Sequence, residues 1–263
     1  MTTGNSRVKE ARKLSRRSVR SERRLFLADG PKAVEGALSV EGCVLEVFAT
    51  PAATDQYAGL ARAGQAAGAP WTLVDDRALA SLSDSVTPAG VVAVCRFLDR
   101  PLAHLLDRAP RLVALCADVR DPGNAGTVIR SADAAGADAV VIAGSSVDPY
   151  NPKTVRATVG SLFHLPVAVE ADPAAAVRAL QTAGLVVLAA DGGGEVDLFE
   201  ADQLLAGPTA WLLGNEAHGL PDDLAALADH RVRIPIHGSA ESLNLSTAAA
   251  LCLYASARAH RRS

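Results

Sequence analysis

The chain has 263 residues and a formal net charge of −3 at pH 7, long enough for one large domain or two ordinary ones. Hydrophobic residues make up 49% of it and aromatic residues only 4%, and short apolar runs alternate with amphipathic ones, which favours an α/β architecture. No apolar run approaches the ~20 residues of a membrane span, and the basic amino terminus lacks the apolar block of a secretory signal. We therefore expect a cytoplasmic protein.

Positive charge is concentrated at the amino terminus. Residues 1–24 form a basic arm with nine Lys or Arg against two Glu, a net charge of +7, which leaves −10 for the rest of the chain. Such an arm suits a polyphosphate backbone such as that of RNA. A solvated helix explains the same feature equally well.

The next segment, residues 25–98, predicts a small α/β domain. Strands are expected at 25–28, 43–50, 71–74 and 91–95, with helices at 31 onward, 55–67 and 77–82. Residues 99–110 contain two prolines and many charges around the pattern LAHLL, and we predict a linker there.

Residues 111–263 predict a second α/β domain. Strands are expected at 112–117, 139–143, 185–190, 210–213 and 232–236, and helices at 125–135 and 173–183. The last two strands are short and apolar, as buried strands of a parallel sheet are. Gly192–Gly194 has neither the Lys-Ser/Thr of a P-loop nor the GxGxxG spacing, so a flexible connection is predicted.

Polar residues follow directly after these two strands. Gly214, Asn215 and Glu216 follow the first, and a stretch containing Ser242 and Asn244 follows the second. Ligand crevices of α/β proteins lie at the carboxyl ends of parallel strands, so this region is the candidate site. A tight turn with a solvated Glu, and a merely polar helix start, are the structural alternatives.

A third polar stretch opens the predicted helix at 125–135. Asn124 is a candidate amino-terminal cap, and Arg130 lies two turns further along. A helix amino terminus with these side chains could hold an anionic oxygen, although an ordinary capped helix with an exposed arginine explains them as well.

The cysteines and histidines predict no metal site. Cys43, Cys95, Cys116 and Cys252 each lie in an apolar run with no CxxC or Cys/His spacing, which indicates buried, reduced thiols. The six histidines show no HExxH or paired spacing and are most simply surface or packing residues; His218 lies near the candidate site but carries no independent signal.

Four stretches in order, NAGTVIRSADAAGA, NPKTVRATVGSLFHLPV, WLLGNEAHGL and RIPIHGSAESLNLSTAAAL, resemble the SpoU/TrmH family of SPOUT-class RNA ribose 2'-O-methyltransferases. The resemblance covers residues 111 to the carboxyl terminus. It implies a SPOUT-type α/β domain with a trefoil knot. Residues 25–98 resemble, more weakly, the small ribosomal-protein-like substrate-binding domain that precedes many members.

The resemblance also implies roles for matching residues. The implied catalytic residues are Arg130, Asn124, Glu216, Ser242 and Asn244. The implied S-adenosylmethionine-binding residues are Leu213, Gly214, Asn215, Ile234, Ile236, Leu243 and Asn244. Family members are usually homodimers with the last helix in the interface, for which Leu251, Leu253 and Tyr254 are candidates.

The reaction that the resemblance implies is transfer of a methyl group to a ribose 2'-hydroxyl of RNA. Because a guanidinium stays protonated, Arg130 is expected to stabilise the developing alkoxide while a neighbouring phosphate takes the proton. The preceding domain favours 23S ribosomal RNA over transfer RNA as substrate. A transfer RNA methyltransferase, a non-catalytic RNA-binding module and a nucleotide-using small-molecule enzyme are the alternatives.

Overall fold

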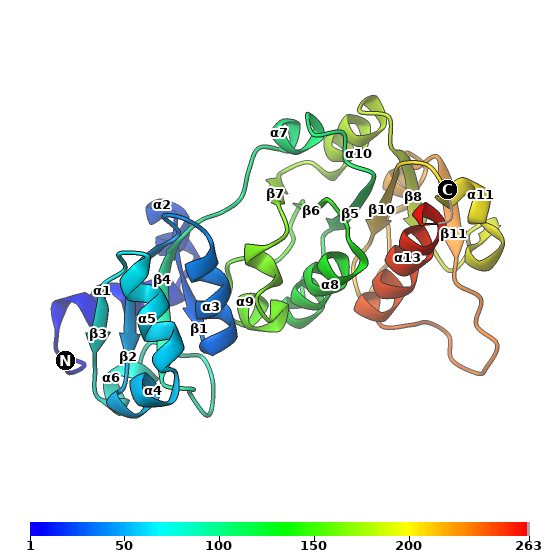
Figure 1. Cartoon of the computed structure of the whole chain (residues 1–263). Helices are drawn as coiled ribbons and strands as arrows, with labels where there is room; N and C mark the ends of the chain where they lie inside the picture. Colours follow the sequence, from blue (N-terminus) through cyan, green and yellow to red (C-terminus); the bar gives the residue numbers. More distant parts are fainter. Residues whose placement is uncertain (262–263) are drawn as a thin grey trace. The chain divides into compact units, whose positions relative to one another are not determined.

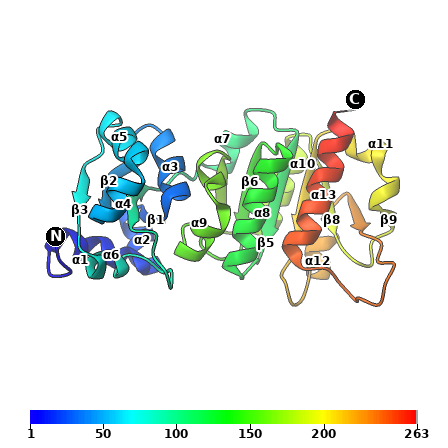
Figure 2. The ribbon, with the colours of Figure 1, turned by 60° about the horizontal axis from the view of Figure 1, so that its bottom comes forward.

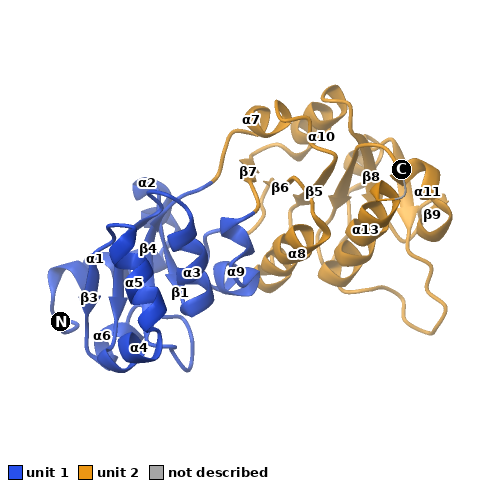
Figure 3. Ribbon diagram, viewed as in Figure 1, with its two compact units in different colours: residues 1–98, 148–164 blue, residues 99–147, 165–263 orange. Residues whose placement is uncertain are grey.

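The computed structural model describes residues 1–261, which form two compact units (Figure 3). Unit 1 comprises Met1–Leu98 and Asp148–His164, and unit 2 comprises Asp99–Val147 and Leu165–Ser263. Each unit is an α/β structure built around its own sheet.

Unit 1 has a four-stranded sheet in the order β1-β4-β2-β3. The strands are β1 (Leu25–Asp29), β2 (Val44–Ala49), β3 (Trp71–Leu73) and β4 (Val91–Arg96). Strand β4 is antiparallel to both neighbours, and β3 is parallel to β2. The helices are α1 (Ser6–Arg12), α2 (Arg17–Arg23), α3 (Pro31–Ser39), α4 (Pro51–Gln56), α5 (Ala58–Ala66), α6 (Asp76–Ala80) and α9 (Pro152–Thr158), with 3-10 turns η1 (Lys13–Ser15) and η2 (Ser161–Phe163).

The basic arm is a folded part of unit 1. Val8 of α1 and Leu14 of η1 are buried in one core with Phe48 of the sheet and Leu79 of α6. Figure 2 shows α1, α2 and α6 on one side of the sheet and α3 and α5 on the other. The apolar residues at positions 8, 11 and 14 recur at helical spacing, which gives the arm a face to bury.

Segment 148–164 also packs within unit 1, although the predicted second domain, residues 111–263, includes it. The Tyr150 hydroxyl accepts a 2.7 Å hydrogen bond from the backbone N–H of Leu98, and its ring stacks on Phe97 with centroids 3.8 Å apart. Phe163 packs on Phe26, 6.0 Å between centroids. These are long-range aromatic contacts, which local sequence patterns do not reveal.

Unit 2 has a seven-stranded, fully parallel sheet in the order β7-β6-β5-β10-β8-β11-β9 (Figure 1). The strands are β5 (Leu112–Ala117), β6 (Ala139–Ala143), β7 (Val167–Glu170), β8 (Val186–Ala190), β9 (Val196–Asp197), β10 (Thr209–Leu213) and β11 (His230–Arg233). The helices are α7 (Leu102–Leu106), α8 (Pro122–Ala135), α10 (Pro173–Thr182), α11 (Asp202–Leu205), α12 (Asp222–Ala225) and α13 (Leu245–His260), with the 3-10 turn η3 (Leu198–Glu200).

Both faces of this sheet are covered by helices. Val113 and Leu115 of β5 point into a core with α7, α10 and α12, while the alternate residues, such as Ala114, are equally buried on the other side. Helices α8 and α13 lie side by side there in both views (Figures 1 and 2). Burial on both faces explains the continuous apolar runs of the strands.

Several element boundaries differ from the sequence predictions, and the predicted linker at 99–110 contains helix α7. Helix α8 begins at Pro122 and is capped by Asp121, whose carboxylate accepts from the N–H of Asn124 at 2.7 Å, so Asn124 is not the cap. The predicted helix at 55–67 is two helices separated at Tyr57. The last predicted strand, 232–236, instead ends at Arg233, which leaves Ile234 and Ile236 in a loop.

All four cysteines are buried free thiols, in agreement with the sequence prediction. Burial, with a smaller effect of the nearby Glu216 charge, raises the pKa of Cys116 to about 12. Within residues 1–261, no three His, Cys, Asp or Glu side chains come together as a metal site would require. Over the same range, none of the helices has the length and apolar character needed to cross a bilayer.

Candidate functional site

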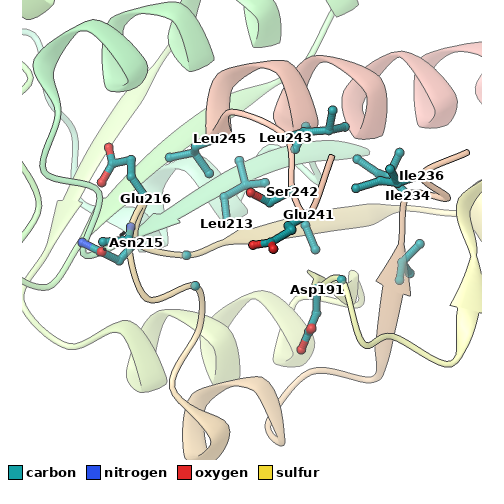
Figure 4. Close-up of a pocket in the computed structure, with 17 residues that line it drawn as sticks. Asp191, Leu213, Asn215, Glu216, Ile234, Ile236, Glu241, Ser242, Leu243 and Leu245 are labelled. Carbon is teal, nitrogen blue, oxygen red and sulfur yellow. Dashed lines mark hydrogen bonds between the residues drawn. The ribbon is translucent and has the colours of Figure 1, made fainter. Parts of the chain in front are cut away.

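A cavity of about 290 Å³ opens at the carboxyl ends of β8, β10 and β11 in unit 2 (Figure 4). Its apolar lining comes from Leu213, Val232, Ile234, Ile236, Leu243, Leu245 and nearby alanines. Its polar lining comes from Asp191, Asn215, Glu216, Glu241 and Ser242. A pocket with apolar walls and a few convergent polar groups is the usual form of a small-molecule site.

Glycine is required where β10 leaves the sheet. A Cβ on Gly214 would lie 2.5 Å from the backbone carbonyl carbon of Gly219, closer than any side chain tolerates. The turn is closed by backbone hydrogen bonds of 2.9 Å in both directions between Asn215 and Gly219. The GNEAHG stretch therefore folds into a tight loop whose backbone forms one wall of the cavity.

Asp191 supplies a fixed carboxylate to the cavity wall. Its Oδ2 accepts from the Arg231 guanidinium at 2.7 and 3.0 Å, and its Oδ1 accepts from the N–H of Gly193 at 2.8 Å. A Cβ on Gly194 would lie 2.7 Å from the backbone of Arg231. The triple-glycine loop is thus closely packed at the cavity, not the plain flexible connection that the sequence predicted.

A second, wider cavity of about 1080 Å³ adjoins the first. The two share Asn215, Glu216, Ala217 and Gly219 in their linings. The remaining lining of the second cavity is Asp118, Arg120, Asp121, Pro122, Asn124, Ser145, His218, Pro221 and Asn244. The tight loop after β10 therefore separates a small, partly apolar cavity from a larger polar one.

Three motif residues form one hydrogen-bond chain beside this loop. Asn244 donates from Nδ2 to Oδ1 of Asn124 at 3.0 Å, and Asn124 donates from Nδ2 to Oε1 of Glu216 at 3.3 Å. Asn244 also caps α13, because its Oδ1 accepts from the N–H of Ser246 at 2.9 Å. The chain joins the starts of α8 and α13 to the loop after β10.

Glu216 is held as an ionised carboxylate. Its Oε2 accepts from the N–H of Arg120 at 3.1 Å, and its Oε1 from the N–H of Asp121 at 3.0 Å. Desolvation is the largest single effect and opposes ionisation, but the backbone donors, together with the Asn124 side chain, outweigh it and lower the pKa of Glu216. Both of its oxygens are engaged, so it is suited to orienting the loops and not to taking a proton.

Asn215 ties the same loop to the end of β5. Its Nδ2 donates to the carbonyl oxygen of Asp118 at 2.9 Å, and its Oδ1 accepts from the N–H of Ala217 at 2.9 Å. Asp118 has a left-handed backbone (φ 55°), and its Oδ1 accepts from the N–H of Ser145. Loops that follow β5, β6 and β10 therefore meet in one hydrogen-bonded cluster.

The structure brings together most of the residues that the sequence singled out. Six of the seven cofactor candidates line the smaller cavity: Leu213, Gly214, Asn215, Ile234, Ile236 and Leu243. The seventh, Asn244, lines the larger cavity instead, with Asn124. Ser242 lines the smaller cavity just before the helix.

Arg130 is the exception. It lies on the exposed side of α8, lines neither cavity, and makes no hydrogen bond or ion pair with any residue from 1 to 261. Its guanidinium is therefore free to meet a ligand or another chain.

Sequence reasoning missed Asp191, Gly192, Asp118 and Ser145 as lining residues. Each directly or nearly follows a strand, β8, β5 or β6, so the rule that located the other polar loops could have found them. Gly192–Gly194 matches no known phosphate-loop spacing, so the aspartate directly before it carried no motif signal.

Comparisons with known proteins agree with this geometry. The model of the SpoU rRNA Methylase family matches residues 111–254, and that of the MRM3-like substrate binding domain matches residues 5–93. The chain is 32% identical over 256 residues to the 23S rRNA (guanosine(2553)-2'-O)-methyltransferase RlmP of Bacillus subtilis (strain 168), covering 95% of each chain.

Two solved structures are similar over nearly the whole chain. An AdoMet-bound rRNA methyltransferase from Sinorhizobium meliloti has 34% identity and a TM-score of 0.84, with 97% of this chain and 95% of that chain covered. The SpoU methyltransferase AviRb from Streptomyces viridochromogenes, in complex with the cofactor AdoMet, has 31% identity and a TM-score of 0.84, with 98% and 100% covered.

Proposed function

Because the chain belongs to the SpoU rRNA Methylase family, we propose that it methylates a ribose 2'-hydroxyl of 23S ribosomal RNA with S-adenosylmethionine as methyl donor. The observation that carries the proposal is the hydrogen-bond chain of Asn244, Asn124 and Glu216 at the boundary of two adjoining cavities. One cavity has the size and lining for a nucleoside cofactor, and the other is wide and polar enough for a nucleotide of RNA.

The residues of the smaller cavity fit the cofactor. Leu213, Ile234 and Leu243 offer apolar walls for a flat heterocycle, and the close turn at Gly214 leaves backbone exposed to the ligand. Asp191 and Glu241 offer carboxylates to a molecule that carries ribose hydroxyls and positive charge. When bound, S-adenosylmethionine supplies an activated methyl group for in-line displacement.

The residues of the larger cavity would hold the target nucleotide. Asn124 and Asn244 are fixed relative to each other by their 3.0 Å hydrogen bond, so the groups that face the cavity are preorganised. Glu216, with both oxygens engaged, fixes the loop that both cavities share. Ser242 lines the smaller cavity, and its hydroxyl is not needed for the helix cap, so it is available to the cofactor.

Arg130 is the proposed catalytic arginine. Its positively charged guanidinium would stabilise the developing 2'-alkoxide, while a neighbouring RNA phosphate takes the proton. The free, exposed state of Arg130 supports a role that is completed only when RNA or a second copy of the chain is bound.

We further propose a cytoplasmic homodimer with a trefoil knot in unit 2. The exposed Leu251 and Tyr254 of α13 (39% and 53% exposed) support an interface on that helix. Leu253, the third interface candidate from the sequence, is fully buried inside unit 2 and cannot contribute. The knot is proposed from the family resemblance; in unit 2, the loops that follow β10 and β11 both line the smaller cavity.

The relatives act on different nucleotides. One is named for guanosine 2553 of 23S rRNA, and another, 40% identical over 176 residues, for uridine 2479. We therefore propose a ribose of the 23S molecule as the target, and mapping of the methylated linkage identifies the nucleotide.

The test is methyl transfer from labelled S-adenosylmethionine to total bacterial RNA, with the product mapped by resistance to alkaline cleavage. We expect label at one alkali-resistant linkage of 23S rRNA. Arg130→Ala should abolish transfer and leave cofactor affinity unchanged. Arg62→Ala, a matched change at an exposed arginine of α5, should leave both unchanged.

Each other outcome contradicts a stated part of the proposal. Label in transfer RNA would overturn the substrate. Cofactor binding without transfer to any RNA would overturn the reaction. Full activity of Arg130→Ala would remove that residue from the mechanism, and RNA binding without cofactor binding would favour a non-catalytic RNA-binding module.

A further inference from the structure

The basic arm carries a set of cations that the protein itself does not use. Five of its nine Lys or Arg side chains have partners: Arg7 pairs with Glu46, Lys13 and Arg23 with Glu10, Arg20 with Asp148, and Arg24 lies over the Phe97 ring. The other four are Lys9, Arg12, Arg16 and Arg17. All four are exposed, and none has a hydrogen-bond or ion-pair partner among residues 1–261.

These four side chains come from one short stretch of the chain, residues 9–17. Lys9 and Arg12 are three residues apart on α1, so they are neighbours on its surface. Arg16 and Arg17 follow after a single 3-10 turn, where α2 begins. The set is here called the arm face.

The arm face is rigidly attached. The Arg20 side chain is 2% exposed, and its Nε and Nη2 both donate to Oδ2 of Asp148, at 2.9 and 2.7 Å. Its Nη1 donates to the carbonyl oxygens of Leu14 and Ser15, at 2.9 and 2.8 Å. One buried guanidinium therefore fixes the turn between α1 and α2, and with it the arrangement of the cations around it.

The charge of the surroundings indicates what the arm face binds. Residues 25–98, the rest of the amino-terminal half, hold eight Asp or Glu against four Lys or Arg. Within the amino-terminal half, a polyanion is therefore attracted to the arm and repelled by residues 25–98. Four unpartnered cations on a preordered surface suit the regularly spaced phosphates of an RNA strand, because their neutralisation releases counterions and costs little ordering of the protein.

We infer that the arm face, Lys9, Arg12, Arg16 and Arg17, is a docking surface for the RNA phosphate backbone. The inference rests on the proposed function and adds to it the residues that hold the RNA outside the reaction site. The model of the MRM3-like substrate binding domain matches this chain from residue 5 onward, so the matched region includes the arm. Contacts here are to phosphates, so they contribute affinity and not sequence selection.

The test is charge reversal at the start of α2. Arg16→Glu/Arg17→Glu places carboxylates at a helix amino terminus, where the helix dipole favours them, so the fold is preserved. The matched control is Lys32→Glu/Arg62→Glu on α3 and α5. It changes the net charge by the same amount on the opposite side of the sheet (Figure 2).

The readouts are the Kd for deproteinised 23S rRNA as a function of KCl concentration, and the steady-state constants for methyl transfer. We expect the arm variant to bind RNA roughly tenfold more weakly at low salt. Its slope of log K against log salt should be smaller by about 1 to 2, which corresponds to one or two lost phosphate contacts. The KM for RNA should rise, with kcat and the KM for S-adenosylmethionine unchanged, and the control should differ little from the wild type.

The outcomes separate the two proposals. A wild type that neither binds nor methylates RNA overturns the proposed function. A wild type that methylates RNA, with an arm variant of equal KM and salt slope, overturns the arm face alone. Binding to vesicles rich in phosphatidylserine that is lost in the arm variant, with RNA affinity unchanged, would assign the face to a membrane and contradict our inference.

Discussion

The side chain of Asn244 contacts that of Asn124 across 120 residues of sequence, through a 3.0 Å hydrogen bond from Nδ2 to Oδ1. The same Asn244 caps helix α13 through its own Oδ1. One side chain therefore has two tasks, one in stability and one in the site, and a substitution can separate them.

Asn244→Asp should preserve the cap of helix α13 and abolish the hydrogen bond to Asn124. An aspartate still accepts from the N–H groups of Ser246 and Thr247, but it cannot donate to Asn124. We expect thermal stability within about 0.5 kcal/mol of the wild type, together with a large loss of kcat. Asn244→Ala removes both functions and should cost about 1 kcal/mol as well. Calorimetry and methyl transfer assays measure the two effects, and equal activity of Asn244→Asp and wild type would show that the donor is not needed.

Glu216→Gln should change how the protein responds to acid. The pKa of Glu216 is lowered in the folded protein, so the ionised carboxylate contributes stability above its unfolded pKa, near 4.5, and this contribution is lost as the pH falls through the folded value. Glutamine lacks the charge, and its NH₂ group cannot accept from a backbone N–H.

The variant should therefore be less stable than the wild type at neutral pH, and the difference should shrink below pH 4.5. Urea unfolding across this pH range measures it. A constant difference at all pH values would mean that the carboxylate charge is not the cause. Glu241→Gln, at an exposed carboxylate, is the control.

Much of the fold could be predicted because its signals are local. β5 and β6 have the predicted bounds, 112–117 and 139–143, since a buried parallel strand is a short apolar run between breakers. The polar loops that follow β10 and β11 were located because each comes directly after such a run. Boundaries that depend on a cap were harder, because Asp121 and Asn124 are equally good caps by type, and only the chain entering the helix decides between them.

What the sequence did not contain was the pairing of distant segments. Nothing local links Arg20 to Asp148, 128 residues away, or Phe26 to Phe163. The placement of segment 148–164 in unit 1 depends on these contacts. The family resemblance led to the site residues but not to their connections, such as the two backbone N–H groups that donate to the Glu216 carboxylate.

Gly214→Ala should be strongly harmful. Its Cβ would lie 2.5 Å from backbone atoms of Gly219, and backbone cannot move aside as a flexible side chain can. We expect a loss of about 1 to 3 kcal/mol in stability, as for other overpacked sites, and weaker S-adenosylmethionine binding because the displaced loop lines the cavity. Gly207→Ala, where a Cβ meets nothing within 4 Å, is the control. Titration calorimetry measures S-adenosylmethionine affinity, and thermal unfolding measures stability. Equal values for Gly214→Ala and Gly207→Ala would contradict the importance of the close approach.

Arg20→Ala should destabilise unit 1 far more than a surface arginine would. Removing one partner of a buried pair leaves the other charge without compensation, which costs about 3 to 5 kcal/mol, and here the carbonyl oxygens of Leu14 and Ser15 lose a donor as well. Arg178→Ala breaks an exposed ion pair to Asp172 at 3.9 Å and should cost less than about 1 kcal/mol.

Adding Asp148→Asn to Arg20→Ala should recover part of the loss, because the uncompensated buried carboxylate is then gone. Denaturant unfolding of the single and double variants measures this, and identical stabilities of Arg20→Ala and Arg178→Ala would contradict the anchoring role of Arg20 and the preordered arm face that depends on it.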